Sequence, residues 1–433
     1  MKLNLKYNFI YIFLITLFFF LWDASLNNII FISENYNIYT FNYLIVILLV
    51  PILFNFINNN KYSIYNLFNG QKYIILFSLF IFFHFFLTNI INDQAIGNYE
   101  IINLLYLLIL SIIFSNYREF ISDNFEKILK LFLIILIFFS FYESNNIFNA
   151  GQCNNKFFLI SFVADNLKLN LSNSIYTENS HLAMMMVGVI FSGFYILITN
   201  NKNKMFFLFL LMASILIVLL NYSTTFFVAY LFCQILFIMF FYKKINGNFF
   251  LYTTLFLILN SVIFFKDTNC VSKIKDIKPK DIVEKKIDKK DTNLTTLIYQ
   301  RSAILTIDTI INHPLGWGND GMDNATINLL EKPEYRQYTI GERLIKGKYY
   351  YIYKLNLKDG LSNFFKILNE FGIFSLLVLY FFIKYLLKLK KINSYNVFVI
   401  AIFITMCVRG AGYYNGGFIF CIFEFIYLKN LKK

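Results

Sequence analysis

The chain has 433 residues, of which 58% are hydrophobic and 15% are charged, and its mean hydropathy is +0.58. A soluble fold of this size cannot hide so much apolar surface, so the composition excludes a soluble protein and predicts an integral membrane protein. The formal net charge of +14 would suggest nucleic-acid binding in a soluble protein. In this chain, lysines in short loops beside the apolar segments account for most of the excess positive charge, so no nucleic-acid partner is expected.

Hydropathy predicts an all-α, polytopic membrane domain that covers residues 1–433. A transmembrane helix needs about 20 apolar residues, and about twelve apolar runs come near this length. The predicted spans are 8–22, 38–57, 73–91, 100–115, 130–143, 181–199, 205–221, 225–242, 249–265, 364–384, 395–410 and 416–428.

The first run follows Lys2 and Lys6 and could be taken for a signal peptide, but it closes on Phe20-Leu-Trp-Asp23 without a small-residue cleavage pattern. We therefore predict a retained first helix.

Basic residues mark one side of the membrane. If the N-terminus is cytoplasmic, the outer short loops contain only Lys156 and Lys168, and the inner ones carry nearly all other short-loop charge. This asymmetry predicts that both termini are cytoplasmic, and that the polar segment 266–363 is an extracytoplasmic loop between the ninth and tenth spans. The inner basic residues are Lys2, Lys6, Lys61, Lys72, Arg118, Lys127, Lys202, Lys204, Lys243, Lys244, Lys388, Lys390, Lys391, Lys429, Lys432 and Lys433.

The five cysteines form no CxxC motif or Cys/His cluster, so neither a metal site nor a cofactor is expected. Cys153 and Cys270 both fall in predicted outer loops. A disulfide and two unpaired thiols are both compatible with this placement.

The outer loop has two unlike halves. Residues 273–291 alternate in charge and are poor in apolar side chains, which predicts a solvated strap. Residues 295–311 instead carry apolar side chains at helical spacing, with Arg301 and Asp308 seven residues apart. This pattern predicts an amphipathic helix on or near the outer membrane surface. Its apolar face would consist of Leu297, Ile304, Leu305, Ile307, Ile310 and Ile311.

A glycine-rich turn follows this helix, which ends at His313-Pro314 because proline cannot continue it. In the next residues, Leu-Gly316-Trp-Gly318, the two glycines allow the backbone to approach a ligand closely. A bare structural turn is the alternative interpretation.

The order of these pieces resembles the O-antigen polymerase and ligase superfamily. The pieces are Arg301, the amphipathic helix, Pro314-Leu-Gly-Trp-Gly318, and the stretch from Asn363 through Glu370 to Gly372 at the start of the next span. The resemblance covers about 178–384 by local pattern and the whole chain by topology. It implies an oligosaccharide repeat-unit polymerase for O-antigen, capsule or exopolysaccharide, in the bacterial cytoplasmic membrane.

Two departures from the family pattern bear on this assignment. Ligases of the superfamily typically carry a histidine at the second site, where this chain has Leu361 before Ser362. Many members have a Ser-Arg pair where the eighth span begins, whereas this chain reads Asn221-Tyr-Ser-Thr-Thr225. The first departure argues against a ligase, and the second removes one expected outer cation.

The chemistry that the resemblance implies is glycosyl transfer between glycans linked to undecaprenyl pyrophosphate. These lipid-linked glycans and membrane lipid are the expected partners, with flippase and chain-length regulator proteins as further candidates. A pyrophosphate leaving group needs cations. Arg301 is the first candidate because a guanidinium can hold phosphate oxygens with two hydrogen bonds, and the alternative is snorkelling to lipid head groups. Further outer cations are Arg336, Arg343 and Arg409.

A base for the attacking hydroxyl is predicted at Glu178 and His181, three residues apart at the start of the sixth span. Helix capping by Thr177 or Asn179 is the alternative role of this segment. Other polar candidates are a packed His84, a substrate-binding His313 beside the glycine-rich turn, and Glu370, which either lines the same cavity or caps its helix.

Two further functions stay open from the sequence. A ligase would move a finished glycan to another acceptor. A transporter or flippase for lipid-linked sugars would show internal repeats and mid-membrane charges, which are not evident in the predicted spans.

Overall fold

The computed structural model describes residues 8–23, 40–58, 63–93, 98–142, 176, 179–200, 204–266, 294–331, 342–345, 348–351 and 360–427. This part of the chain is predominantly helical, as predicted. The helices are α1 (Asn8–Phe20), α2 (Thr40–Leu44), η3 (Ile45–Leu48), α3 (Leu49–Asn58), α4 (Ile64–Leu67), α5 (Lys72–Ile91), α6 (Asn98–Tyr142), α8 (Asn179–Thr199), α9 (Lys204–Leu220), α10 (Thr224–Phe241), α11 (Gly247–Lys266), α14 (Leu294–Asn312), α15 (Met322–Glu331), α16 (Asn363–Phe371), η6 (Gly372–Phe374), α17 (Ser375–Lys388), α18 (Ser394–Val408), η7 (Asn415–Gly417) and α19 (Phe418–Ile426).

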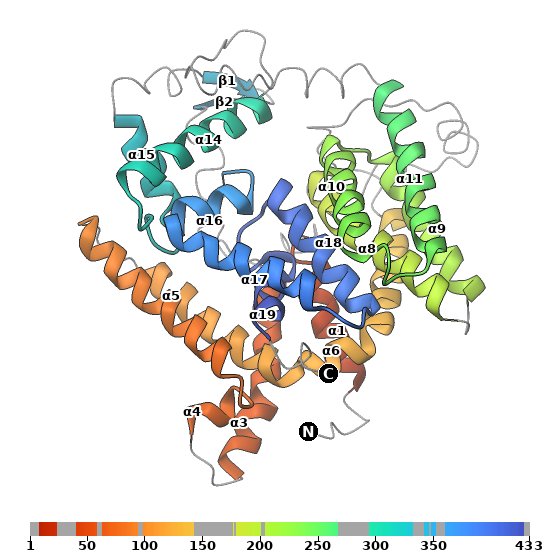
Figure 1. The fold of residues 1–433 in the computed structure, drawn as a ribbon, viewed down its shortest axis with the longest axis horizontal. Helices are drawn as coiled ribbons and strands as arrows, with labels where there is room; N and C mark the ends of the chain where they lie inside the picture. The colour runs from red at the N-terminus through yellow and green to blue at the C-terminus, as the bar shows by residue number, and fades with distance from the viewer. Residues whose placement is uncertain are drawn as a thin grey trace.

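One short antiparallel hairpin interrupts the helical pattern, within the segment predicted as the large polar loop. It pairs β1 (Glu342–Ile345) with β2 (Lys348–Tyr351). Figure 1 shows the hairpin together with α14 and α15 at one end of the molecule, and α3 and α4 at the opposite end.

Several helices have the length and composition of membrane spans, which supports the predicted class of helical membrane protein. Shorter apolar helices overlap other predicted segments, and the predicted spans 100–115 and 130–143 both fall within one helix, α6. That all twelve segments cross the membrane stays a prediction. Within the described residues, the six helices long and apolar enough to cross are Lys72–Ile91, Glu100–Ser140, Ser180–Thr199, Thr224–Phe241, Gly247–Phe265 and Asn363–Lys388.

The predicted inner loop 116–129 is wrong as a loop, because residues 98–142 form one helix, α6. Charged side chains in this part of α6 form ion pairs, so the helix continues without a break. Arg118 makes a buried bidentate ion pair with Glu424 of α19 (2.9 and 2.5 Å). Lys130 pairs with Glu126 one turn earlier at 2.6 Å. In Figure 1 the first part of α6 lies beside α5 and its last part beside α9.

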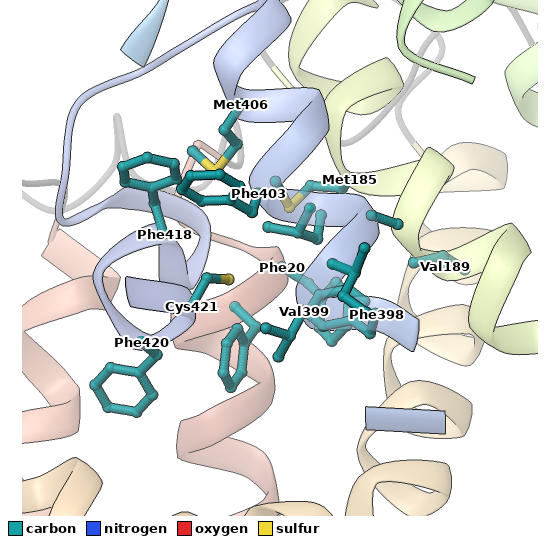
Figure 2. Close-up of a cluster of buried hydrophobic side chains, with 14 of the residues drawn as sticks. Phe20, Met185, Val189, Phe398, Val399, Phe403, Met406, Phe418, Phe420 and Cys421 are labelled. Carbon is teal, nitrogen blue, oxygen red and sulfur yellow. The ribbon is translucent and has the colours of Figure 1, made fainter. Parts of the chain in front are cut away.

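The helices α8 and α18 form the centre of the apolar core. Gly188 permits their close approach, since a Cβ there would lie 2.7 Å from Ile402 Cγ1. Figure 2 shows Met185 and Val189 of α8 beside Phe398 and Val399 of α18. All four side chains are fully buried. Packing at such density depends on shape, so the core fixes the mutual position of helices far apart in sequence.

The outer surface of the helices is also apolar. Phe83 and Ile90 of α5, Phe209 of α9 and Phe265 of α11 are each at least 66% exposed. Side chains of this kind on the outside of long apolar helices face lipid in a membrane, which accounts for the large exposed apolar surface.

Candidate functional site

The glycine-rich turn docks onto the C-terminal end of α16. The backbone N–H groups of Trp317 and Gly318 donate to the carbonyls of Asn369 (3.0 Å) and Glu370 (2.9 Å), and Ile373 N–H donates back to Pro314 (2.8 Å). The two segments that carry most of the family resemblance therefore contact each other directly.

Close packing explains the glycines of this turn. Gly316 and Gly318 have φ of +82° and +88°, which disfavour any side chain. A Cβ at Gly316 would collide with the Glu370 backbone, and one at Gly318 with Thr88 Oγ1 of α5. The glycines therefore hold the turn between α5 and α16, and their predicted contact with substrate stays a prediction.

The polar face of α16 is turned into the protein. The Lys366 ammonium lies 2.9 Å from Asp320 Oδ1 and 3.3 Å from Glu370 Oε1. We call these three residues the triad. All three are at most 5% exposed. Buried ionisable groups at the end of a membrane helix are costly and usually serve function.

Neutral side chains complete the surroundings of the triad. The Asn103 side-chain amide of α6 donates to Asp320 Oδ2. The Lys366 ammonium lies 4.9 Å from the centre of the Tyr413 ring, and the Tyr413 hydroxyl faces Glu370. Burial, and next the Glu370 charge, raise the pKa of the Tyr413 phenol, so this hydroxyl stays protonated.

An apolar groove lies beside the triad. The space free of atoms between α5, α6, α16, α17 and α19 is about 490 Å³ with its open mouth included, and about 30 Å³ of it is accessible to the centre of a water molecule. Apolar side chains form nearly all of its walls, and its polar lining consists of Asn319, Tyr413 and Tyr414, next to the triad. The apolar lining residues are Phe77, Phe80, Ile81, Leu107, Ile367, Phe371, Phe374, Leu377, Val378, Ile419 and Ile422.

The segment Arg409-Gly-Ala-Gly-Tyr-Tyr-Asn-Gly-Gly417, which we call the 409–417 loop, connects these parts. Gly410 N–H donates to the Leu361 carbonyl (2.9 Å) and Gly412 N–H to Asn363 Oδ1 (3.0 Å), which binds the loop to the start of α16. The Tyr414 hydroxyl donates to the Asn103 carbonyl of α6 (3.0 Å). Half-buried Arg409 begins the loop.

Arg301 lies on α14 and is 2% exposed, so it is buried in the protein and does not snorkel to the surface. Its neighbour Ser302 donates to the Gly360 carbonyl (3.0 Å), just before α16. Thr309 further along α14 donates to Asn369 Oδ1 at 2.8 Å. Arg301 therefore belongs to the helix that packs on α16.

The predicted apolar face of α14 is divided between the protein interior and the surface. Ile304 and Leu305 are buried against Trp317 and the start of α15, whereas Ile307, Ile310 and Ile311 are about half exposed or more. The physical reason is that the polar side chains near Arg301 have partners on α16, so α14 packs through a mixed face. The exposed isoleucines remain suited to contact with lipid.

His181 has a carboxylate partner that sequence reasoning missed. Its Nδ1 contacts Asp23 Oδ2 at the end of α1, and Asp23 is 2% exposed. The rings of His181 and Trp22 lie 5.0 Å apart. Glu178, the predicted neighbour, lies outside the described residues.

Trp22, whose ring lies beside His181, approaches the far end of the 409–417 loop. A Cβ at Gly416 would lie 3.0 Å from Trp22 Nε1. The loop thus lies against Trp22 at one end and reaches the triad through Tyr413.

The other predicted residues have clear positions. His84 is packed as expected, with Nε2 2.8 Å from the Leu315 carbonyl. His313 lies in the turn, with Nδ1 3.3 Å from Asn92 Oδ1 and its ring 4.1 Å from that of Trp317.

Glu370 does not cap the start of α16, because Ser362 is the N-cap. Arg343 lies in β1, while Arg336, Cys153 and Cys270 are outside the described residues.

Sequence reasoning also missed Asp320, Lys366 and the 409–417 loop. The signals were present, because Lys366 and Glu370 are spaced by one helical turn inside a predicted span, and four glycines follow Arg409.

Comparison of the chain with known protein families, with curated proteins and with solved structures finds no match.

Proposed function

We propose that this protein polymerises undecaprenyl-pyrophosphate-linked oligosaccharide repeat units at the outer face of the cytoplasmic membrane. The observation that carries the proposal is the apolar groove that ends at buried polar and charged groups. Such a groove suits a lipid whose long apolar tail is joined to an anionic head. Ligand sites of this kind combine apolar walls with a few placed polar groups.

The proposed reaction joins two lipid-linked glycans. A sugar hydroxyl of one repeat unit attacks C1 of the sugar at the reducing end of the other glycan. The new C–O bond forms as the bond from C1 to the pyrophosphate oxygen breaks, and the electron pair leaves with the lipid pyrophosphate. Arg301, with Arg409 as a second cation, stabilises this leaving group.

His181 is the proposed acceptor for the proton of the attacking hydroxyl. Because Nδ1 faces the Asp23 carboxylate, Nε2 is the ring nitrogen directed away from that partner. A carboxylate on one ring nitrogen fixes the tautomer and supports the positive charge that forms when the other nitrogen takes a proton.

The choice of polymerase over ligase rests on Leu361. This residue, 2% exposed, stands where ligases of the superfamily have a histidine, and it offers no acid or base there. Its carbonyl instead receives the Gly410 N–H.

The triad favours one second candidate, a transporter of lipid-linked glycans. Buried charges in a membrane domain commonly mark a substrate or proton pathway. A transporter would move the lipid between leaflets without lengthening its glycan.

The test uses purified protein in proteoliposomes with a defined lipid-linked repeat unit. The polymerase proposal predicts a ladder of products with increasing numbers of repeats, and a deletion strain with single-repeat glycans. Translocation of unchanged lipid-linked units would support the transporter. Loss of surface glycan while long polymer accumulates on the lipid would support a ligase.

A further inference from the structure

The triad contains more negative than positive charge. Among the residues that the structure describes, Lys366 is the cation in contact with both Asp320 and Glu370, at 2.9 and 3.3 Å. If both carboxylates are ionised, the buried group carries an uncompensated negative charge, which is strongly unfavourable away from water.

The carboxylates of Asp320 and Glu370 differ in the hydrogen-bond donors that they accept from. Asp320 receives Lys366 on Oδ1 and the Asn103 amide on Oδ2, so both its oxygens are stabilised in the ionised form. Glu370 has the longer contact to Lys366 and faces the Tyr413 hydroxyl, and it is 0% exposed. Hydrogen bonds to the charged form favour ionisation, so Glu370 is the group that takes up a proton when negative charge increases nearby.

A lipid that binds in the groove brings negative charge close to Glu370 if it carries a phosphate. The polar lining residues of the groove adjoin the triad, because Asn319 precedes Asp320 in the chain and the Tyr413 ring lies 4.9 Å from the Lys366 ammonium. Asn319 is 3% exposed, and its side-chain amide faces the Tyr414 hydroxyl but makes no close hydrogen bond among the described residues. A phosphate oxygen in the groove can accept from this buried donor, so the Asn319 amide points to a ligand there.

We propose that the triad is a proton-linked site for the phosphate of a polyprenyl-type lipid held in the groove. When the lipid binds, one proton moves from solvent to a Glu370 oxygen. Lys366 then loses its weaker partner and turns its charge toward the phosphate, while it keeps Asp320. The inference rests on the proposed function for the identity of the lipid.

Other titratable groups face the same region and enter the design of the test. Tyr413 and Tyr414 of the 409–417 loop stay protonated, because burial raises the pKa of both phenols. His84 of α5 lies beside the groove, with its ring 5.0 Å from that of Phe371. A His84→Gln variant therefore serves as the control for a histidine origin of any pH effect.

The experiment measures binding of undecaprenyl methyl phosphate to the full chain in detergent, from about pH 6 to about 9. The probe is a phosphodiester, so its own charge does not change in this range. Affinity should rise as pH falls through the alkaline end of this range, by up to about tenfold per pH unit for one proton, and should level off at the pH where Glu370 already carries the proton in the free protein. Glu370→Gln should bind the lipid with little pH dependence, and His84→Gln should behave like the wild type.

Three further measurements distinguish the contributions of the lipid tail, the phosphate and the proton to binding. Undecaprenol, which lacks the phosphate, should show no pH dependence. Dimethyl phosphate, which lacks the tail, should bind much more weakly, and equal binding of this head group would overturn the role of the groove. Should Glu370→Gln fail to fold, proton uptake by the wild type in weakly buffered solution at about pH 9 decides the question, with up to about one proton expected per lipid.

The inference and the proposed function can fail separately. Polymerisation by a protein whose lipid affinity does not depend on pH overturns the inference alone. Proton-linked lipid binding without polymerisation supports the inference and overturns the polymerase. A Glu370→Gln variant with the full pH dependence of the wild type also overturns the inference.

Discussion

The Lys366 ammonium lies 2.9 Å from Asp320 Oδ1, and both side chains are almost completely buried although 46 residues separate them in the chain. Asp320 lies after α14 and Lys366 on α16, so the pair joins the polar segment to the membrane helices. A buried ion pair adds little net stability over apolar packing, but loss of one partner leaves the other charge buried and uncompensated.

Lys366→Met should therefore destabilise the protein by about 3–5 kcal/mol. Adding Asp320→Asn should recover part of this loss, since it removes one of the carboxylates left behind. The measurement is unfolding in detergent by denaturant or heat. Lys388→Met, an exposed lysine on α17, is the control and should stay within about 0.5 kcal/mol of the wild type. Equal stability of the two lysine variants would contradict the buried-charge argument.

Gly316→Ala should be much more destabilising than Gly247→Ala. Gly316 has φ of +82° and its Cβ would collide with the Glu370 backbone, whereas a Cβ at Gly247 meets nothing within 4 Å. The left-handed conformation alone costs a side chain about 1–2 kcal/mol. Thermal unfolding of the two variants in one detergent compares them directly, and similar midpoints would show that the turn rearranges at low cost.

Reporter fusions test the predicted sidedness. Fusions at Asn60, Asn203 and Lys391 should report the cytoplasm, and fusions at Asp288 and Asn324 the outer side, because the short basic loops are retained inside. An inward-facing Asp288 would overturn both the topology and the proposed outer site.

The apolar segments could be located from sequence because lipid contact imposes a long apolar run on each helix. Residues 116–129 were misread because their polar side chains resemble a loop, and the Arg118–Glu424 pair that satisfies them involves the far end of the chain. The triad was missed for the same reason. Lys366 and Glu370 are visible as a helical pair, but Asp320 and Tyr413 reach them only through tertiary packing.

Arg301 provides a test of pyrophosphate stabilisation. Arg301→Ala should reduce the polymerisation rate by roughly 10²–10³, the usual effect of losing one electrostatic donor to a leaving group. Arg301→Lys should restore only part of the rate, because lysine keeps the positive charge but cannot make the two parallel hydrogen bonds of a guanidinium to a phosphate. Rates are measured on purified protein, with membrane abundance as the check on folding. Full activity of Arg301→Ala would assign this buried arginine to the packing of α14.

Asp23 and His181 test the proposed base, and a pH profile separates chemistry from structure. His181→Gln should lower the rate by about 10²–10⁴, the usual contribution of a general base. Asp23→Asn should also slow polymerisation, and it should move the acid limb of the rate profile to lower pH, since a neighbouring carboxylate favours the protonated imidazole. A purely structural contact between α1 and α8 would lower stability without moving this limb.

Two variants of the preceding segment decide between catalysis and capping. Thr177→Ala perturbs the predicted cap at a cost of about 0.5–2 kcal/mol and should leave the pH profile unchanged. Glu178→Gln should shorten the polymer only if Glu178 shares the proton with His181. The base assignment is wrong if His181→Gln and Asp23→Asn polymerise normally while Thr177→Ala does not, because capping would then be the whole role of this segment.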